Sequence, residues 1–146
     1  MTAPIAAAER LLAFVDASPT PFHVCAAAAK RLEEVGFTRH DLRDQWQSGP
    51  QRGYAIVGGS LIAWHVGDLA TAHQGFRVVG AHTDSPNLRL KQNHDSVRTG
   101  STMVALEPYG GPLLESWLDL DLGIAGRVFL HGGRELPRPE PRRRGE

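Results

Sequence analysis

A histidine and an aspartate separated by one residue, His82 and Asp84, are the strongest candidates for chemistry in this sequence. The apolar segment 76–81 precedes them, and its composition predicts a short strand that is buried on both faces. Ligand sites in open α/β sheets lie beyond the carboxyl ends of such strands. If the backbone stays extended, Asp84 points to the same side as His82. A carboxylate in that position can fix the tautomer and orientation of a metal-binding imidazole.

A purely structural interpretation of the same pair stays open at this point. His82 would then be a hydrogen-bonded histidine near a turn, and Asp84 a turn or capping residue. A His-x-Asp pattern is short and therefore arises often by chance. Ser85 follows directly, but the members of a catalytic triad converge from different elements. We therefore assign no serine nucleophile.

The remaining histidines show no spacing that is typical of a metal cluster: His23, His40, His65, His73, His94 and His131. We expect His23 to be structural, early in a helix, and His65 to lie on the surface of a strand. Cys25, among alanines on a predicted helix, is expected to be a buried and inert thiol. The three tryptophans are interpreted as core anchors: Trp46, Trp64 and Trp117.

The elements that must position these residues follow from periodicity and turn chemistry. Two helices are predicted, at about 4–17 and 21–35, with Thr20 capping the second and Gly36 ending it. The apolar spacing of the second helix predicts a buried face: Val24, Ala27, Ala28, Leu32 and Val35. Strands at 53–57 and 61–66 are joined by a tight turn at Gly58 and Gly59.

Further strands are predicted at 88–90, 102–107, 113–118 and 124–130. No helix of useful length is predicted after Gly36, although a three-layer α/β domain needs helices on both faces of its sheet. The sequence therefore predicts an incomplete α/β domain.

The composition excludes some classes of partner. The chain has 146 residues with 16 basic and 16 acidic side chains, so no charge excess favours nucleic acid or an anionic membrane. A single cysteine is compatible with a reducing cytoplasm. There is no basic leader region and no run approaching the roughly 20 apolar residues that span a bilayer. We expect a soluble cytoplasmic protein, with residues 134–146 as a disordered tail rich in proline and arginine.

Four collinear segments resemble the M18 aminopeptidases. Residues 80–91 closely resemble the first metal-binding motif of that family. Residues 14–23 resemble the family's opening helix-turn-helix, and residues 52–54 with 59–64 resemble the hairpin that follows it. Residues 107–128 resemble the segment after the metal motif. All of these segments occur in the family's order. The match extends over nearly all of residues 5–133, and four motifs in order are far more specific than one.

The resemblance implies an incomplete three-layer α/β/α aminopeptidase catalytic domain, followed by the start of an inserted β-rich dimerisation domain. The expected boundaries are 1–93 for the catalytic part, 94–133 for the insertion and 134–146 for the tail. It also implies an enzyme that removes N-terminal residues, often acidic ones, from peptides. Such enzymes use two divalent metal ions, usually zinc, and form large homo-oligomers.

Two residues carry the family's site onto this chain. His82 matches a metal-ligand histidine, and Asp84 matches the catalytic aspartate that orients it. The other ligands and the catalytic glutamate lie further along in the family, so we expect an N-terminal fragment that is inactive alone. Leu120 stands where many relatives carry a basic residue, and the sequence after about Leu136 departs from the family pattern. The alternative is a non-catalytic truncated fragment or interaction module.

Overall fold

The computed structural model describes residues 3–46, 51–67 and 75–132. They divide into two compact units. The first consists of Met1–Thr83 and Ile124–Glu146, and the second of Asp84–Gly123. The predicted tail and His73 lie outside the described residues.

Two helices open the first unit, α1 at Ala3–Asp16 and α2 at Pro21–Glu34. Thr20 caps α2: its backbone is extended, and its hydroxyl accepts a hydrogen bond from the backbone N–H of His23. Gly36 follows the helix with φ of +85°, a conformation that favours glycine. These findings confirm both predicted helices and the signals that bound the second. Within the described ranges, no helix has the length and apolar character needed to cross a membrane.

The buried face of α2 is not the predicted one. His23, Cys25 and Ala29 are buried, whereas Val35 is exposed and the rest of the predicted face is only half-buried. The apolar stripe of α1 is likewise exposed, at Ile5, Leu11, Leu12 and Val15. Periodicity identifies an apolar stripe but does not show which neighbour covers it. Here α2 turns its Cys25 side toward the sheet.

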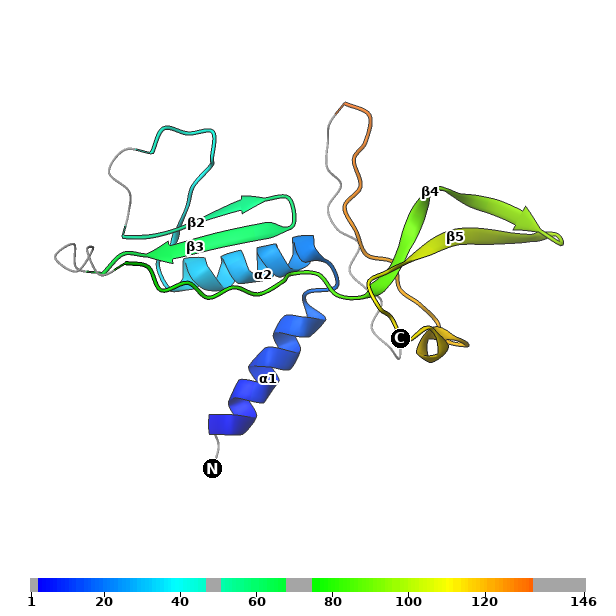
Figure 1. The fold of residues 1–146 in the computed structure, drawn as a ribbon, viewed down its shortest axis with the longest axis horizontal. Coiled ribbons are helices and arrows are strands. Elements are labelled where there is room, and N and C mark those ends of the chain that lie inside the picture. Colours follow the sequence, from blue (N-terminus) through cyan, green and yellow to red (C-terminus); the bar gives the residue numbers. More distant parts are fainter. Residues whose placement is uncertain (1–2, 47–50, 68–74, 133–146) are drawn as a thin grey trace. The chain divides into compact units, whose positions relative to one another are not determined.

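The first unit contains a three-stranded sheet in the order β1-β2-β3. β1 (Thr38–Arg39) runs parallel to β2 (Arg52–Val57), and β3 (Ser60–His65) pairs antiparallel with β2. α2 lies along this sheet (Figure 1), whose central strand supplies the buried residues Tyr54 and Ala55. The predicted hairpin turn at Gly58 and Gly59 is confirmed. A Cβ added at Gly59 would lie 2.7 Å from Cβ of Pro21, so the turn packs closely on the start of α2.

Residues 75–82 carry no helix or strand, so the predicted buried strand at 76–81 is wrong for this structure. Phe76 and Val79 are both 98% exposed, and Val78 is 84% exposed. A strand needs a partner for its backbone hydrogen bonds, and none pairs with this segment in the described part of the chain. The apolar composition therefore indicates a segment suited to burial, but it does not show which element would cover it.

The second unit is built on a long antiparallel hairpin of β4 (Asn87–Arg98) and β5 (Ser101–Tyr109). Its turn places Thr99 and Gly100 at φ of +50° and +80°, as primed hairpin turns require. The register shifts between Leu90 and Asp95. This hairpin contains the predicted strands 88–90 and 102–107.

Two other predicted strands are wrong. Residues 113–118 contain a 3-10 helix, η2, at Leu114–Trp117. The Ser116 hydroxyl donates to the carbonyl of Leu113 at 2.6 Å, a local bond that favours a turn over an extended strand. Residues 124–130 contain only an isolated bridge at Phe129. In both segments, the residues favour a strand, but no partner strand pairs with them in the described part of the chain.

Candidate metal-binding motif

His82 follows residues 75–81 of the first unit, which form no helix or strand, and its side chain is exposed. The backbone bends at the next residue, Thr83, so the condition under which Asp84 would point to the same side as His82, an extended backbone, is not met. The Thr83 hydroxyl donates a 2.7 Å hydrogen bond to the carbonyl of Gly59 in the β2–β3 turn. The residue that follows the candidate ligand is thus bound to the β2–β3 hairpin of the first unit.

Asp84 begins the second unit and is half-buried. Its Oδ2 accepts a hydrogen bond from the hydroxyl of Tyr109 at 2.5 Å. Because the neutral hydroxyl donates this bond to the carboxylate, the pKa of Tyr109 is raised above its ordinary value. Sequence reasoning missed Tyr109. The available signal was its position at the start of the fourth segment that resembles the family.

His82 and Asp84 therefore belong to different compact units. Their assignment as metal ligand and orienting carboxylate stays a prediction from the motif. Among the residues that the structure describes, no three His, Cys, Asp or Glu side chains gather into a group that could hold a metal ion.

Other histidines have structural surroundings. His23 lies early in α2, as the sequence predicts; it is buried, and its ring Nδ1 lies 2.7 Å from the hydroxyl oxygen of Thr20. His65 is exposed on β3, also as predicted. His94 lies beside Asp95, with 2.7 Å between ring nitrogen and carboxylate oxygen.

His40 belongs to an aromatic cluster with Trp46 and Trp64. Its ring centroid lies 5.2 Å from that of Trp46 and 5.4 Å from that of Trp64, and the two indoles stack at 5.0 Å. Trp46 is 45% exposed, so the prediction that it anchors the core is wrong, although its indole packs on Trp64.

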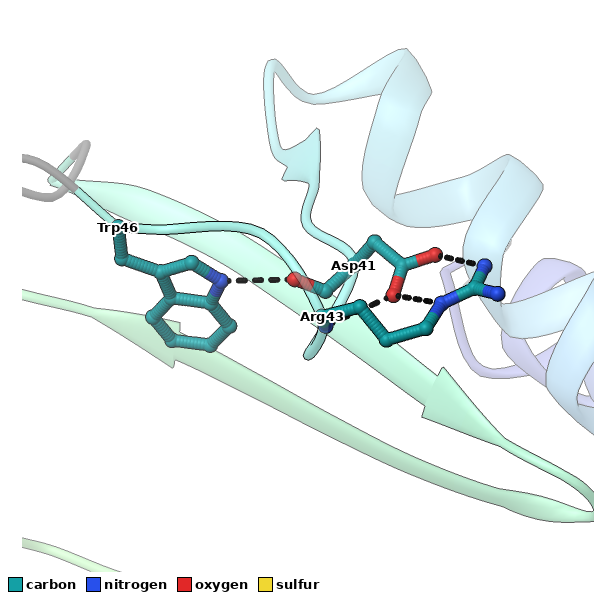
Figure 2. A network of polar contacts seen from close by, with 3 residues as sticks. All are labelled: Asp41, Arg43 and Trp46. Carbon is teal, nitrogen blue, oxygen red and sulfur yellow. Dashed lines mark hydrogen bonds and ion pairs between the residues drawn. The ribbon is translucent and has the colours of Figure 1, made fainter.

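A polar network holds that loop in place (Figure 2). The Trp46 indole N–H donates to the carbonyl of Asp41 at 2.8 Å. The Arg43 guanidinium donates to both carboxylate oxygens of Asp41, at 2.9 and 2.6 Å. These bonds hold the pKa of Asp41 well below its ordinary range. Because this ion pair is exposed to solvent, it contributes little to the free energy of unfolding. Its role is to fix the conformation of the loop.

Cys25 is 2% exposed, and burial raises the pKa of its thiol. A thiol that resists ionisation is a poor nucleophile, which agrees with the predicted inert role. It lines a cavity of about 350 Å³ together with Tyr54 and Arg127. The Tyr54 hydroxyl donates to Glu33, and the Arg127 guanidinium lies over the ring of Phe22, 4.3 Å from its centroid. These contacts join α2 to the sheet and to residues after Ile124.

Comparison with known proteins identifies the family. Residues 14–138 match the sequence profile of the family described as "Aminopeptidase I zinc metalloprotease (M18)". The chain is 51% identical over 125 residues to a "Probable M18 family aminopeptidase 2" of Streptomyces coelicolor, a match that covers 86% of this chain and 29% of that protein. The chain therefore belongs to the M18 peptidase family and spans less than a third of that relative's length.

Solved structures agree with this assignment. A chain in the cryo-EM structure of the Ape4 and Nbr1 complex matches with a TM-score of 0.82 and 34% identity, covering 93% of this chain and 27% of that one. The S. cerevisiae mApe1 dodecamer matches with a TM-score of 0.77 and 32% identity, covering 90% of this chain and 32% of that one. The predicted fold class, part of an α/β aminopeptidase catalytic domain, is confirmed.

Proposed function

We propose that this chain forms the N-terminal part of a zinc-dependent aminopeptidase of the M18 type, which removes N-terminal residues, often acidic ones, from peptides. The match of residues 14–138 to the zinc metalloprotease family carries this proposal. His82 and Asp84 lie within the matched range. The chain covers only 29% of its Streptomyces relative, so the activity belongs to the complete polypeptide.

Within that enzyme, His82 binds one of two divalent ions. Imidazole nitrogen is a common zinc ligand, and His82 is exposed at the end of its segment. In this proposed role, Asp84 would accept a hydrogen bond from the ring N–H of the metal-binding histidine and so fix the tautomer that ligation requires. When bound, the ions polarise the scissile carbonyl and provide a nucleophile at neutral pH. The remaining ligands and the general base come from residues outside this chain.

The proposed assembly is a homo-oligomer, supported by the dodecameric S. cerevisiae relative. We further propose the cytoplasm as its compartment, because the chain has a single cysteine and that thiol is buried. The predicted domains, 1–93 as catalytic and 94–133 as the start of the insertion, remain part of the proposal.

A chimeric peptidase tests the function directly. Residues 14–138 of this chain replace the corresponding segment of the Streptomyces coelicolor relative, and release of p-nitroaniline from glutamyl, aspartyl and leucyl anilides is followed. Activity should vanish with a chelator and return with zinc. His82→Ala should abolish it, and Asp84→Asn should lower it roughly 10- to 100-fold. His65→Ala, at an exposed histidine on β3, is the matched control and should leave activity unchanged. A folded chimera that is equally active with His82→Ala would contradict the proposal.

The second candidate is a non-catalytic truncated fragment or interaction module. The described residues do not gather a metal-binding group, which is compatible with both candidates. If this were the function, the chain would bind a peptidase subunit without supplying a ligand. A chimera that assembles normally, shows no peptidase activity and binds zinc no more weakly with His82→Ala would support this candidate instead.

A further inference from the structure

The hydrogen bond between Tyr109 and Asp84 lies entirely within the second unit. An O–H donor that binds an ionised carboxylate typically lies about 2.5–2.7 Å away, and such bonds are roughly twice as strong as neutral ones. The Tyr109 hydroxyl lies 2.5 Å from Oδ2 of Asp84, within hydrogen-bond distance. The contact joins residues 25 positions apart in the sequence, so the fold of this unit creates it.

The β4–β5 hairpin brings the two residues together. Tyr109 ends β5 and pairs with Asn87, the first residue of β4. Asp84 lies three residues before Asn87, on the segment that leads into the hairpin. After Tyr109, Gly110 has φ of +73°, and a Cβ added there would lie 3.4 Å from Pro86. The chain leaving β5 is thus packed against the chain entering β4, and Asp84 lies beside this junction.

Arg89 holds the tyrosine ring from the neighbouring strand. It pairs with Glu107, which makes Tyr109 its diagonal neighbour on the hairpin. The guanidinium carbon lies 3.2 Å from the centroid of the Tyr109 ring. A cation over an aromatic face is attracted by the ring quadrupole. The ring is therefore held by Arg89 while its hydroxyl holds Asp84.

We propose that Tyr109 is a positioning residue for the metal-binding motif. Its hydroxyl fixes Oδ2 of Asp84 and so restricts rotation of that carboxylate, and Arg89 holds the Tyr109 ring in the orientation that this bond requires. Carboxylates around metal sites are commonly held by hydrogen bonds of their own, so Tyr109 would act on the metal ligand through Asp84. The inference rests on the proposed role of Asp84.

The Tyr109→Phe variant of the chimera tests the inference, since it removes the hydroxyl and keeps the ring over which Arg89 lies. We expect kcat to fall about 3- to 10-fold, at or below the lower end of the roughly 10- to 100-fold loss typical for partners of metal ligands. KM should not change, because the proposed role of Tyr109 is to position Asp84 and not to bind substrate. The double variant with Asp84→Asn should be no less active than Asp84→Asn alone, because Tyr109 acts through Asp84.

Tyr54→Phe is the matched control. It removes a hydroxyl that donates to another carboxylate, Glu33, in the first unit. It should lower the melting temperature of the chimera without changing kcat. Equal losses of kcat in both phenylalanine variants would assign Tyr109 a merely structural role and overturn the inference.

The remaining outcomes separate the two proposals. A loss with Asp84→Asn but not with Tyr109→Phe would overturn the inference and leave the proposed function standing. No loss with either variant would overturn the role proposed for Asp84 as well. Losses that add fully in the double variant would show that Tyr109 acts by another route and would also overturn the inference.

A spectroscopic measurement keeps the inference testable if Tyr109→Phe does not fold. The chain has two tyrosines, so ¹³Cζ labelling gives two resonances. Asp84→Asn in the 146-residue chain should shift the Tyr109 resonance and leave that of Tyr54 in place. An unchanged Tyr109 resonance would overturn the inference.

Discussion

The indole of Trp64 occupies the space next to Gly53 where any other residue would place its Cβ. The two residues are cross-strand partners in the β2–β3 hairpin. A Cβ added at Gly53 would lie 2.3 Å from Cζ2 of Trp64 and 3.0 Å from Cδ2 of His40. Glycine at this position lets the indole lie flat across β2 and stack on Trp46.

Gly53→Ala should therefore destabilise the first unit. Overpacking typically costs about 1–3 kcal/mol in the free energy of unfolding, and here the indole must also shift. Urea unfolding followed by tryptophan fluorescence measures both effects. Gly67→Ala is the control, since a Cβ there meets nothing within 4 Å. Equal stability of the two variants would show that Trp64 moves away freely.

Thr83→Val should loosen the attachment of the motif to the hairpin. The substitution removes the hydroxyl that donates to the Gly59 carbonyl but keeps the side-chain shape. We expect a loss of about 0.5–1.5 kcal/mol in the free energy of unfolding. Thr83→Ser keeps the donor and should recover most of that loss. If serine fails to recover it, the methyl group rather than the hydrogen bond stabilises this position.

Stability should fall at high pH because of Tyr54. Burial and the hydrogen bond to Glu33 raise its pKa in the folded chain. The folded state then holds the proton more tightly than the unfolded state, whose tyrosines titrate near about 10. The contribution is present below that pH and is lost as pH rises through the higher folded value. Circular dichroism between pH 9 and 12 should show a shallower decline for Tyr54→Phe, in which Tyr109 remains.

The exposed segment before His82 should promote self-association of the chain. Phe76, Val78 and Val79 present contiguous apolar surface without a covering element in the described residues. Sedimentation velocity should show concentration-dependent association that Val79→Lys reduces. Gln92→Lys adds the same charge at an exposed site on β4 and should have less effect. A monomer that unfolds cooperatively at high concentration would contradict this expectation.

Signals acting over a few residues were enough to predict part of the fold. Thr20 and Gly36 bound α2 because capping and left-handed backbone are local properties. The Gly58–Gly59 turn follows from the same kind of chemistry. Strand predictions were weaker, because a strand exists only through its partner, and composition at 113–118 and 124–130 does not supply one.

In the candidate site, too, local features could be predicted from the sequence and long-range contacts could not. Its motif, His82 and Asp84, could be predicted from sequence because it is a continuous string within a family pattern. The hydrogen bond from Tyr109 could not, since it depends on the register of the β4–β5 hairpin. Register becomes readable only when both strands and their turn are known.

The register shift divides the β4–β5 hairpin into two halves that differ in how well they tolerate insertions and deletions. Between Leu90 and Asp95, several residues of β4 lie opposite Ala105 alone, so the pairing on one side of the shift does not dictate the pairing on the other. Insertions, deletions or a fused peptide at the Thr99–Gly100 tip can be absorbed beyond this point. The half that aligns Tyr109 with Asn87 would keep its register, so a change at the tip would leave the junction beside Asp84 in place.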